Sequence, residues 1–204
     1  MARPSLQTEA FILQRDSPQE AFRPSTAFSA EHGLLRVLQR IPRKPSPDYL
    51  PLDLFDRVGL MLEGGNAGSW FVKEVRLLER FTGIGAHYRR LQPAAEFTAL
   101  IARNSVHEDS RDSVYRLLQT ALTAFSITDR PDIVGFKSRF CFARDEGYPL
   151  REHWFSTLRS EDRTTVADLL NRPTSDQTIS TTEVARLGQK LEDYLRGHTD
   201  ILVD

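Results

Sequence analysis

Hydrophobic and polar positions alternate with a period of two through the first eighty residues of the chain. The alternation occurs in five short runs bounded by turn residues, a pattern typical of strands with one buried face. In the third run, Leu35 and Val37 lie on one face, whereas Arg36 and Arg40 lie on the other. Five such runs predict a small antiparallel β-barrel, with strands within residues 8–15, 23–30, 32–44, 52–63 and 69–79.

Beyond residue 80 the apolar positions recur with a helical period. Residues 113–125 carry an apolar stripe at helical spacing, and Asp112 is the expected N-cap. Residues 128–147 are expected to hold a second helix. Pro131 is suited to a first helical turn, and Gly147 to the position just after the last turn.

Two further segments are periodic. Residues 180–197 open with a capping box, Ser180 with Glu183, and continue as an apolar stripe. Residues 84–104 are also periodic, and Pro93 is expected to break them into two helices, because proline lacks the N–H that a helix interior requires.

The remaining segment, residues 148–179, has weak periodicity, and its "NRPTSDQT" stretch is typical of a loop. The chain is therefore predicted to be α+β. A β-domain spans residues 1–80, and a helical domain spans residues 81–204.

Charge limits how the chain could bind nucleic acid. The 204 residues carry a formal net charge of −1, which excludes a polycation that binds over its whole surface. Any affinity must come from a local patch. Residues 1–44 hold seven basic against four acidic residues, a local net charge of +3.

The single cysteine, Cys141, excludes an intramolecular disulfide and a multi-cysteine zinc site. It lies between Phe140 and Phe142 on a predicted helix and is expected to be a core residue. The start of the chain lacks the apolar core of a signal peptide, and no apolar run is long enough to cross a bilayer. A cytoplasmic location is the expectation.

Seven short motifs occur in order along nearly the whole chain. The first four are "TEAFILQR", "EAFRPSTAFSAEHGLLRVLQR", "LPLDLFDRVGLMLE" and "VKEVRLLERFTGI". The last three are "DSVYRLLQTALTAF", "FKSRFCFARDEGYP" and "VARLGQKLEDYLRGH". No single motif is specific, but their order resembles the RecO family, the bacterial recombination-mediator proteins of the RecFOR repair pathway.

The resemblance implies a fold and a function. The fold is an N-terminal five-stranded OB-fold β-barrel followed by an α-helical domain. The function is DNA repair and recombination: binding of single- and double-stranded DNA, annealing of complementary strands, and help in loading the recombinase. The implied partners are DNA, the tail of the single-strand-binding protein and RecR. No cofactor, small-molecule substrate, membrane or catalytic activity is implied.

Two features depart from the family pattern. The family often carries a four-cysteine zinc finger just after the segment that matches "GYP". Residues 150–179 contain no cysteine, so no metal is expected, and the lobe at about residues 148–179 must be held by packing. The basic, glycine-containing turn usual after the third strand is replaced by "RIPRKPSP", whose prolines offer no N–H group to a phosphate.

Candidate DNA-binding residues follow from where an OB-fold binds nucleic acid, across its second and third strands and between the flanking loops. Phosphates require cations within reach, and bases require flat apolar surfaces. The candidate cations are Arg15, Arg23, Arg36, Arg40, Arg43 and Lys44. Phe22, expected in the first loop, is the candidate stacking residue. A solvated strand face would explain the same arginines. Trp70 could also stack a base, although a core position is favoured for it.

Two other basic groups lie further along the chain. The first comprises Lys73, Arg76, Arg80, Arg89 and Arg90. Acidic residues are interleaved with it, which favours internal ion pairs; facing outward, the group would instead extend the DNA-binding track. In the second helical segment, three cations recur every seven residues and so share a face. These are the candidates for docking the acidic tail of the single-strand-binding protein, with a solvated face as the alternative: Arg130, Lys137 and Arg144.

Other function classes are less well supported. "HED" at residues 107–109 and "EH" at residues 152–153 offer acid–base groups, but the chain has no nucleophile elbow, phosphate-binding loop or two-histidine helix motif. An enzyme is therefore not expected. The alternative to DNA binding is a protein-interaction adaptor of the repair machinery with weak DNA affinity, which the low overall charge favours.

Overall fold

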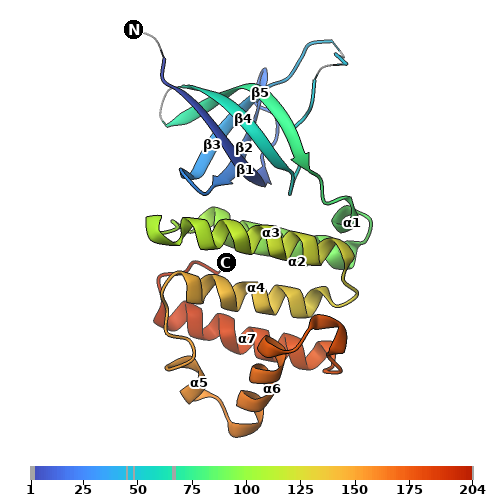
Figure 1. The fold of residues 1–204 in the computed structure, drawn as a ribbon, viewed down its shortest axis with the longest axis vertical. Coiled ribbons are helices and arrows are strands. Elements are labelled where there is room, and N and C mark those ends of the chain that lie inside the picture. Colours follow the sequence, from blue (N-terminus) through green and yellow to red (C-terminus); the bar gives the residue numbers. More distant parts are fainter. Residues whose placement is uncertain (1–2, 45, 48, 66–67, 204) are drawn as a thin grey trace. The chain divides into compact units, whose positions relative to one another are not determined.

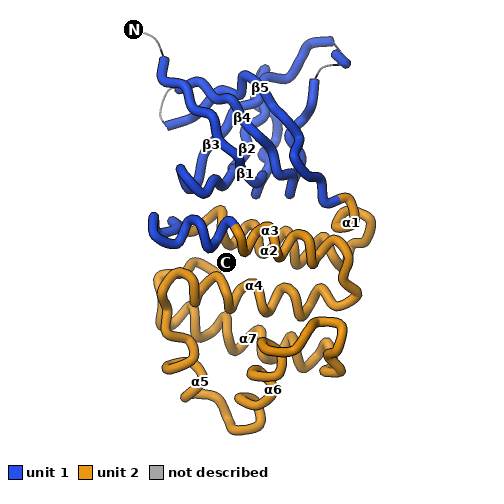
Figure 2. The backbone as a smooth tube through the Cα atoms, in the orientation of Figure 1, with its two compact units in different colours: residues 1–81, 105–115 blue, residues 82–104, 116–204 orange. Residues whose placement is uncertain are grey.

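The structure is a computed structural model that describes residues 3–44, 46–47, 49–65 and 68–203 (Figure 1). Contacts divide the chain into two compact units, residues 1–81 with 105–115 and residues 82–104 with 116–204 (Figure 2). The boundary after Phe81 lies next to the predicted one, but the segment 105–115 belongs to the first unit. Within that unit the Tyr115 ring packs 4.8 Å from the ring of Phe11.

The described part of the first unit contains five strands, as predicted, and the helices follow them. The strands are β1 (Ser5–Arg15), β2 (Phe22–Ser29), β3 (Gly33–Arg40), β4 (Arg57–Gly64) and β5 (Ser69–Glu79). Their order is β1-β2-β3-β5-β4, and β4 pairs back with β1, so the sheet closes on itself as a barrel. Neighbouring strands are antiparallel except β3 and β5, which are parallel.

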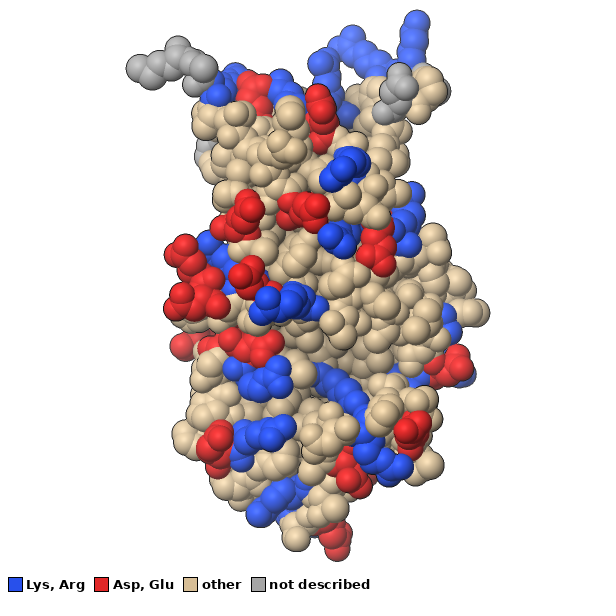
Figure 3. Space-filling model, in the orientation of Figure 1, with Lys and Arg blue, Asp and Glu red and all other residues tan. Residues whose placement is uncertain are grey.

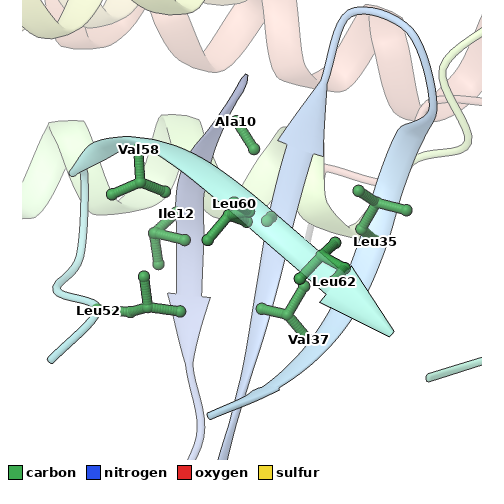
Figure 4. Packing of buried hydrophobic residues seen from close by; sticks show 9 residues of the cluster. Ala10, Ile12, Leu35, Val37, Leu52, Val58, Leu60 and Leu62 are labelled. Carbon is green, nitrogen blue, oxygen red and sulfur yellow. The ribbon is translucent and has the colours of Figure 1, made fainter. Parts of the chain in front are cut away.

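The barrel core consists of the inward-facing residues of the alternating pattern (Figure 4). These side chains come from β1, β2, β3, β4 and the segment before β4, and they point toward one another inside the barrel. The cluster contains Ala10, Ile12, Ala27, Leu35, Val37, Leu52, Val58, Leu60 and Leu62. Burial of this apolar surface is what stabilises the closed sheet.

The fourth strand is shorter than predicted. β4 begins at Arg57, whereas the sequence pattern placed it from residue 52. Phe55 has a φ of 72°, which interrupts the extended backbone just before the strand. Leu52 is nonetheless buried in the barrel core, so its apolar character reflects packing and not strand membership.

The helical elements follow the strands, with α3 shared between the two units. They are α1 (Thr82–Gly85), α2 (Tyr88–Arg103), α3 (Arg111–Ile127), α4 (Pro131–Asp145), α5 (Trp154–Thr157), α6 (Ser160–Asn171) and α7 (Thr181–His198). Single 3₁₀ turns lie at η1 (Glu108–Ser110) and η2 (Thr174–Asp176). None of the helices in the described residues is long and apolar enough to span a membrane.

Helix-end signals gave mixed results. Ser180 caps α7 by accepting a hydrogen bond from the backbone N–H of Glu183, and Gly147, with a φ of 90°, follows the end of α4; both were predicted. Asp112 is not an N-cap, because α3 begins one residue earlier and places it in the first turn. Its carboxylate still lies where the helix dipole favours negative charge.

The prediction that Pro93 divides a helix is wrong. Pro93 lies inside the continuous helix α2, near its N-terminal end, and the position removes one backbone hydrogen bond. Burial of Ala94, Phe97 and Ile101 on the same helix offsets that loss. A Cβ placed on Gly135 of α4 would lie 3.6 Å from Cβ of Pro93, so the two helices approach closely at this point.

The lobe at residues 148–179 contains a helix, α6, that the sequence pattern did not predict. Val166 and Leu169 are its buried apolar residues, too few for a recognisable stripe. Several interactions hold the lobe within the second unit, two of them through buried side chains. The buried carboxylate of Asp162 accepts hydrogen bonds from Arg186 and Lys190 of α7. Trp154 packs in an aromatic cluster with Phe136, Phe140 and Phe155.

Candidate nucleic-acid interface

Of the predicted DNA-binding residues, Phe22, Arg36 and Arg40 lie on the outward-facing side of β2 and β3. Leu35 and Val37 of β3 are buried, whereas Arg36 and Arg40 are exposed, as the alternation predicts. In the β2–β3 register Phe22 lies opposite Arg40, which places an aromatic ring and a cation side by side on one face.

Two of the predicted cations are already paired with carboxylates. Arg15, at the end of β1, forms an ion pair and a hydrogen bond with Asp53. Arg36 lies 3.6 Å from a carboxylate oxygen of Asp16. A phosphate would have to displace these carboxylates to contact either arginine.

Three other predicted cations, Arg40, Arg43 and Lys44, are exposed. Within the described parts of the chain, no ion pair is formed by any of them. They follow one another from the end of β3 into the connection to β4. Arg23 is different, because it lies opposite the inward-facing Gln39 in the register and is half-buried.

Phe22 is the first residue of β2. The prediction that it lies in the first loop is therefore wrong. Its ring lies 5.3 Å from the ring of Phe71, at an interplanar angle of 54°. Trp70, the other stacking candidate, packs against the barrel core, as the favoured interpretation predicted. Phe71 was not among the predicted site residues.

The two phenylalanines line a hollow where β3 and β5 part. Parallel pairing between these strands covers only three residue pairs, which end at Leu38 and Phe71. Beyond them lies an open hollow of about 780 Å³, here named the aromatic hollow. It is lined by Arg3, Phe22, Gln39, Arg40, Tyr49, Leu50, Phe71, Val72, Lys73, Glu74 and Val75.

The third aromatic residue of the hollow, Tyr49, is positioned by a buried amide. Nε2 of Gln39 donates to the carbonyl of Leu50 at 2.7 Å, and Oε1 accepts from the backbone N–H of Leu52 at 3.0 Å. The Tyr49 hydroxyl donates to the same oxygen at 3.3 Å. The inward-facing end of β3 therefore fixes the segment that supplies Tyr49.

Two further cations, Arg3 and Lys73, lie at the edge of the aromatic hollow and share one carboxylate. Nη1 of Arg3 lies 3.3 Å from Oε1 of Glu63, and Nζ of Lys73 contacts Oε2. Lys73, and to a smaller extent Arg3, lower the pKa of Glu63 below its ordinary value. The carboxylate is therefore ionised at neutral pH.

Charges elsewhere are mostly balanced locally. Figure 3 shows basic and acidic side chains interspersed across one face of the molecule. In the group predicted to form internal ion pairs, Arg80 makes two hydrogen bonds to the buried Asp56, at 2.8 and 2.6 Å. Arg90 likewise lies 3.3 Å from Asp129. The prediction of internal ion pairs is confirmed for these two and for Lys73, which pairs with Glu63.

The three partner-binding candidates, Arg130 just before α4 and two residues within it, contact their own unit. Arg130 makes two hydrogen bonds to Asp132, and Arg144 makes two to Asp145. Nζ of Lys137 donates to the carbonyl of Arg172 at 2.6 Å, and burial lowers the pKa of this ammonium group. Of the three, Arg144 is the exposed one.

A groove of about 670 Å³ lies within the second unit, between α2, α4 and α7. Small residues, among them Pro93, Gly135 and Gly188, leave space along it. Arg139, which lines the groove, lies 2.7 Å from Glu96 and 3.6 Å from Glu192. Charges on the groove wall thus pair with one another.

The structure adds Phe71, Tyr49 and Arg3 to the residues that the sequence had suggested for this surface, and it places Lys73 of the second basic group beside them. Alternation placed Phe71 on a strand, but no local pattern indicates that β5 lies beside β3. The chain matches no model of a known protein family, and no curated protein matches it.

Proposed function

We propose that the first unit binds nucleic acid at the aromatic hollow and along the cations that follow it. The observation that carries this proposal is the arrangement of three aromatic rings beside exposed cations. Phe22, Tyr49 and Phe71 line the same hollow as Arg40, and Arg43 and Lys44 follow in the chain.

Single-stranded nucleic acid suits this arrangement. Unpaired bases stack on aromatic rings regardless of sequence, while cations contact the phosphates. A duplex offers phosphates but no exposed base faces. It would therefore use Arg40, Arg43 and Lys44 without the rings, with weaker binding and a strong salt dependence.

The topology supports assigning the β-domain to the OB-fold. A five-stranded barrel of order β1-β2-β3-β5-β4, in which β4 pairs back with β1, matches that fold, which binds nucleic acid on the face of its second and third strands. Phe22 and the unpaired Arg40 belong to the described part of these two strands.

The resemblance of the seven motifs to the RecO family extends the proposal to a role in recombination and repair. Such a protein would anneal complementary strands and help to load recombinase onto DNA coated by the single-strand-binding protein, with RecR as a further partner. Annealing needs no catalytic residue, because cations reduce the repulsion between two phosphate chains and base pairing drives the reaction.

A second candidate is an adaptor with weak DNA affinity. The pairing of Arg15 with Asp53 and of Arg36 with Asp16 favours it, because two of the six predicted cations are neutralised. The groove between α2, α4 and α7 would then be the principal binding surface.

Fluorescence anisotropy with a short labelled single strand, measured across a salt series, separates the two candidates. The test variant is R40Q/R43Q, and its charge-matched control is R15Q/R36Q, in which the lost cations were paired. We expect the test variant to reduce the salt slope by about 1.4, or about 0.7 for each phosphate contact. The control should change it by less than half as much.

Two results would argue against the proposal. Equal effects of the two variants would show that binding depends on overall charge and not on this surface. Absence of binding by the parent protein at low salt would favour the adaptor.

A further inference from the structure

We propose that Arg3 and Lys73 form a phosphate-binding subsite at the edge of the aromatic hollow, and that Glu63 occupies it in the free protein as an internal competitor. The inference rests on the proposed function, because it adds two contacts and one opposing carboxylate to the same surface. The ligand is a phosphate group of a nucleic acid.

The geometry is that of an anion held between two cations. The two carboxylate oxygens of Glu63 have different partners, Oε1 with Arg3 at 3.3 Å and Oε2 with Lys73. Both cationic side chains are largely exposed, at 64% for Arg3 and 53% for Lys73, whereas that of Glu63 is 25% exposed. The cations are thus accessible to a ligand from solvent.

Backbone pairing places Glu63 and Arg3 next to the ring of Phe71. In the β4–β5 register Glu63 lies opposite Phe71, so the carboxylate and the ring share the outer face. In the β1–β4 register Glu63 lies opposite Ser5, which brings Arg3 near.

Gly64 of β4 allows the N-terminal segment around Pro4 to pack closely against this strand. Its N–H donates to the carbonyl of Pro4 at 2.7 Å, and a Cβ on Gly64 would lie only 2.6 Å from Cγ of Pro4. Any side chain at this position would push Pro4, and with it Arg3, away from Glu63.

Exchange of the carboxylate for a phosphate is physically easy. Solvent screens an ion pair whose cation is exposed, so separating the partly buried Glu63 from the exposed Lys73 costs little. The carboxylate of Glu63 balances only one of its two cations, so this group of three residues keeps one positive charge, although Glu74 also lines the hollow. The pair between Arg80 and the buried Asp56 provides the contrast, because its carboxylate is closed to solvent.

The first variant for the test is Glu63→Gln, which keeps the size of the side chain and removes its charge. We expect it to bind a labelled single strand about 3- to 10-fold more tightly at low salt. Its salt slope should be steeper by about 0.7 to 1.4, for one or two additional phosphates. Glu9→Gln is the matched control, since Glu9 is paired with Arg57 at 2.9 Å and does not line the hollow.

A second pair of variants tests the cations directly. R3Q/K73Q should weaken binding, because it removes both cations and leaves Glu63 to repel the phosphates. The same change made in the Glu63→Gln background should abolish the gain in affinity and return the salt slope to the parent value or below. Thermal unfolding of each variant checks that the barrel is intact.

The possible failures are distinguishable. If the parent binds and Glu63→Gln behaves like Glu9→Gln, or if R3Q/K73Q binds like the parent, the subsite is wrong while the proposed function stands. If the parent does not bind nucleic acid at all, the proposed function and the subsite both fail.

Discussion

Nε2 of Gln39 donates a hydrogen bond to the carbonyl of Leu50 at 2.7 Å, and this contact joins the buried end of β3 to the connection that follows it. The same amide accepts from the N–H of Leu52. One side chain inside the barrel thereby determines where the ring of Tyr49 lies.

Replacing Gln39 with leucine should destabilise the protein and displace Tyr49. The substitution keeps an apolar stem but leaves two buried backbone groups without partners, which costs about 1 to 3 kcal/mol. Urea unfolding measures the loss. Gln7→Leu is the control, because Gln7 is exposed on β1 and forms no such bonds to this segment. An unchanged unfolding midpoint for Gln39→Leu would contradict the role of the amide.

Replacing Phe71 with leucine should weaken binding of a single strand more than that of a duplex. Leucine preserves much of the contact with Phe22 and with the barrel but removes the flat ring. Stacking of one base contributes about 1 to 3 kcal/mol, equivalent to about 5- to 150-fold in affinity. Anisotropy titrations of both DNA forms provide the comparison, and an equal loss on the two forms would argue against stacking.

Replacing Gly83 with alanine should destabilise the second unit. A Cβ at this position would lie 2.1 Å from the carbonyl oxygen of Ser126, a backbone atom that cannot rotate away. The expected loss is about 1 to 3 kcal/mol.

Gly85→Ala is the matched control in the same short helix, because a Cβ there meets no described atom within 4 Å outside its chain neighbours and the helix's own backbone. It should change stability by less than about 0.5 kcal/mol. Trp154 fluorescence reports unfolding of this unit in a Trp70→Phe background, since the chain has two tryptophans. Equal effects of both alanines would exclude the steric explanation.

Replacing Asp162 with asparagine should destabilise the second unit at neutral pH. Arg186, followed by Lys190, holds the pKa of this carboxyl well below its usual range. Loss of the charge should lower the free energy of unfolding by about 1 to 2 kcal/mol. This value is smaller than for a fully buried ion pair, because both cations remain partly exposed and solvent screens them.

The pH dependence distinguishes this ionic contribution from packing. A carboxyl whose pKa is lowered by folding stabilises the protein above its unfolded-state pKa, about 3.9, and that contribution is lost as the pH falls toward the folded-state value. The parent and Asp162→Asn should therefore differ most near pH 7 and converge below about pH 4. Urea unfolding followed by Trp154 fluorescence measures this, and a difference independent of pH would indicate packing instead.

Elements with strong local patterns could be predicted from the sequence. The five strands were located by their alternation, and Ser180 and Gly147 marked the ends of helices because caps are local structures. Helix α6 was missed because Val166 and Leu169 alone do not make a stripe. Pro93 was misjudged because the packing that keeps α2 continuous comes from residues distant in sequence.

The candidate site divides in the same way. Alternation alone determined that Arg36 and Arg40 face outward, since side-chain direction along a strand is a local property. Only the tertiary structure decided which cations are paired, as with Arg15 and Asp53, which are 38 residues apart. It also decided that β5 runs beside β3 and then parts from it, which opens the aromatic hollow. Strand order and ion pairing depend on contacts between residues far apart in the sequence, so no local sequence pattern predicts them.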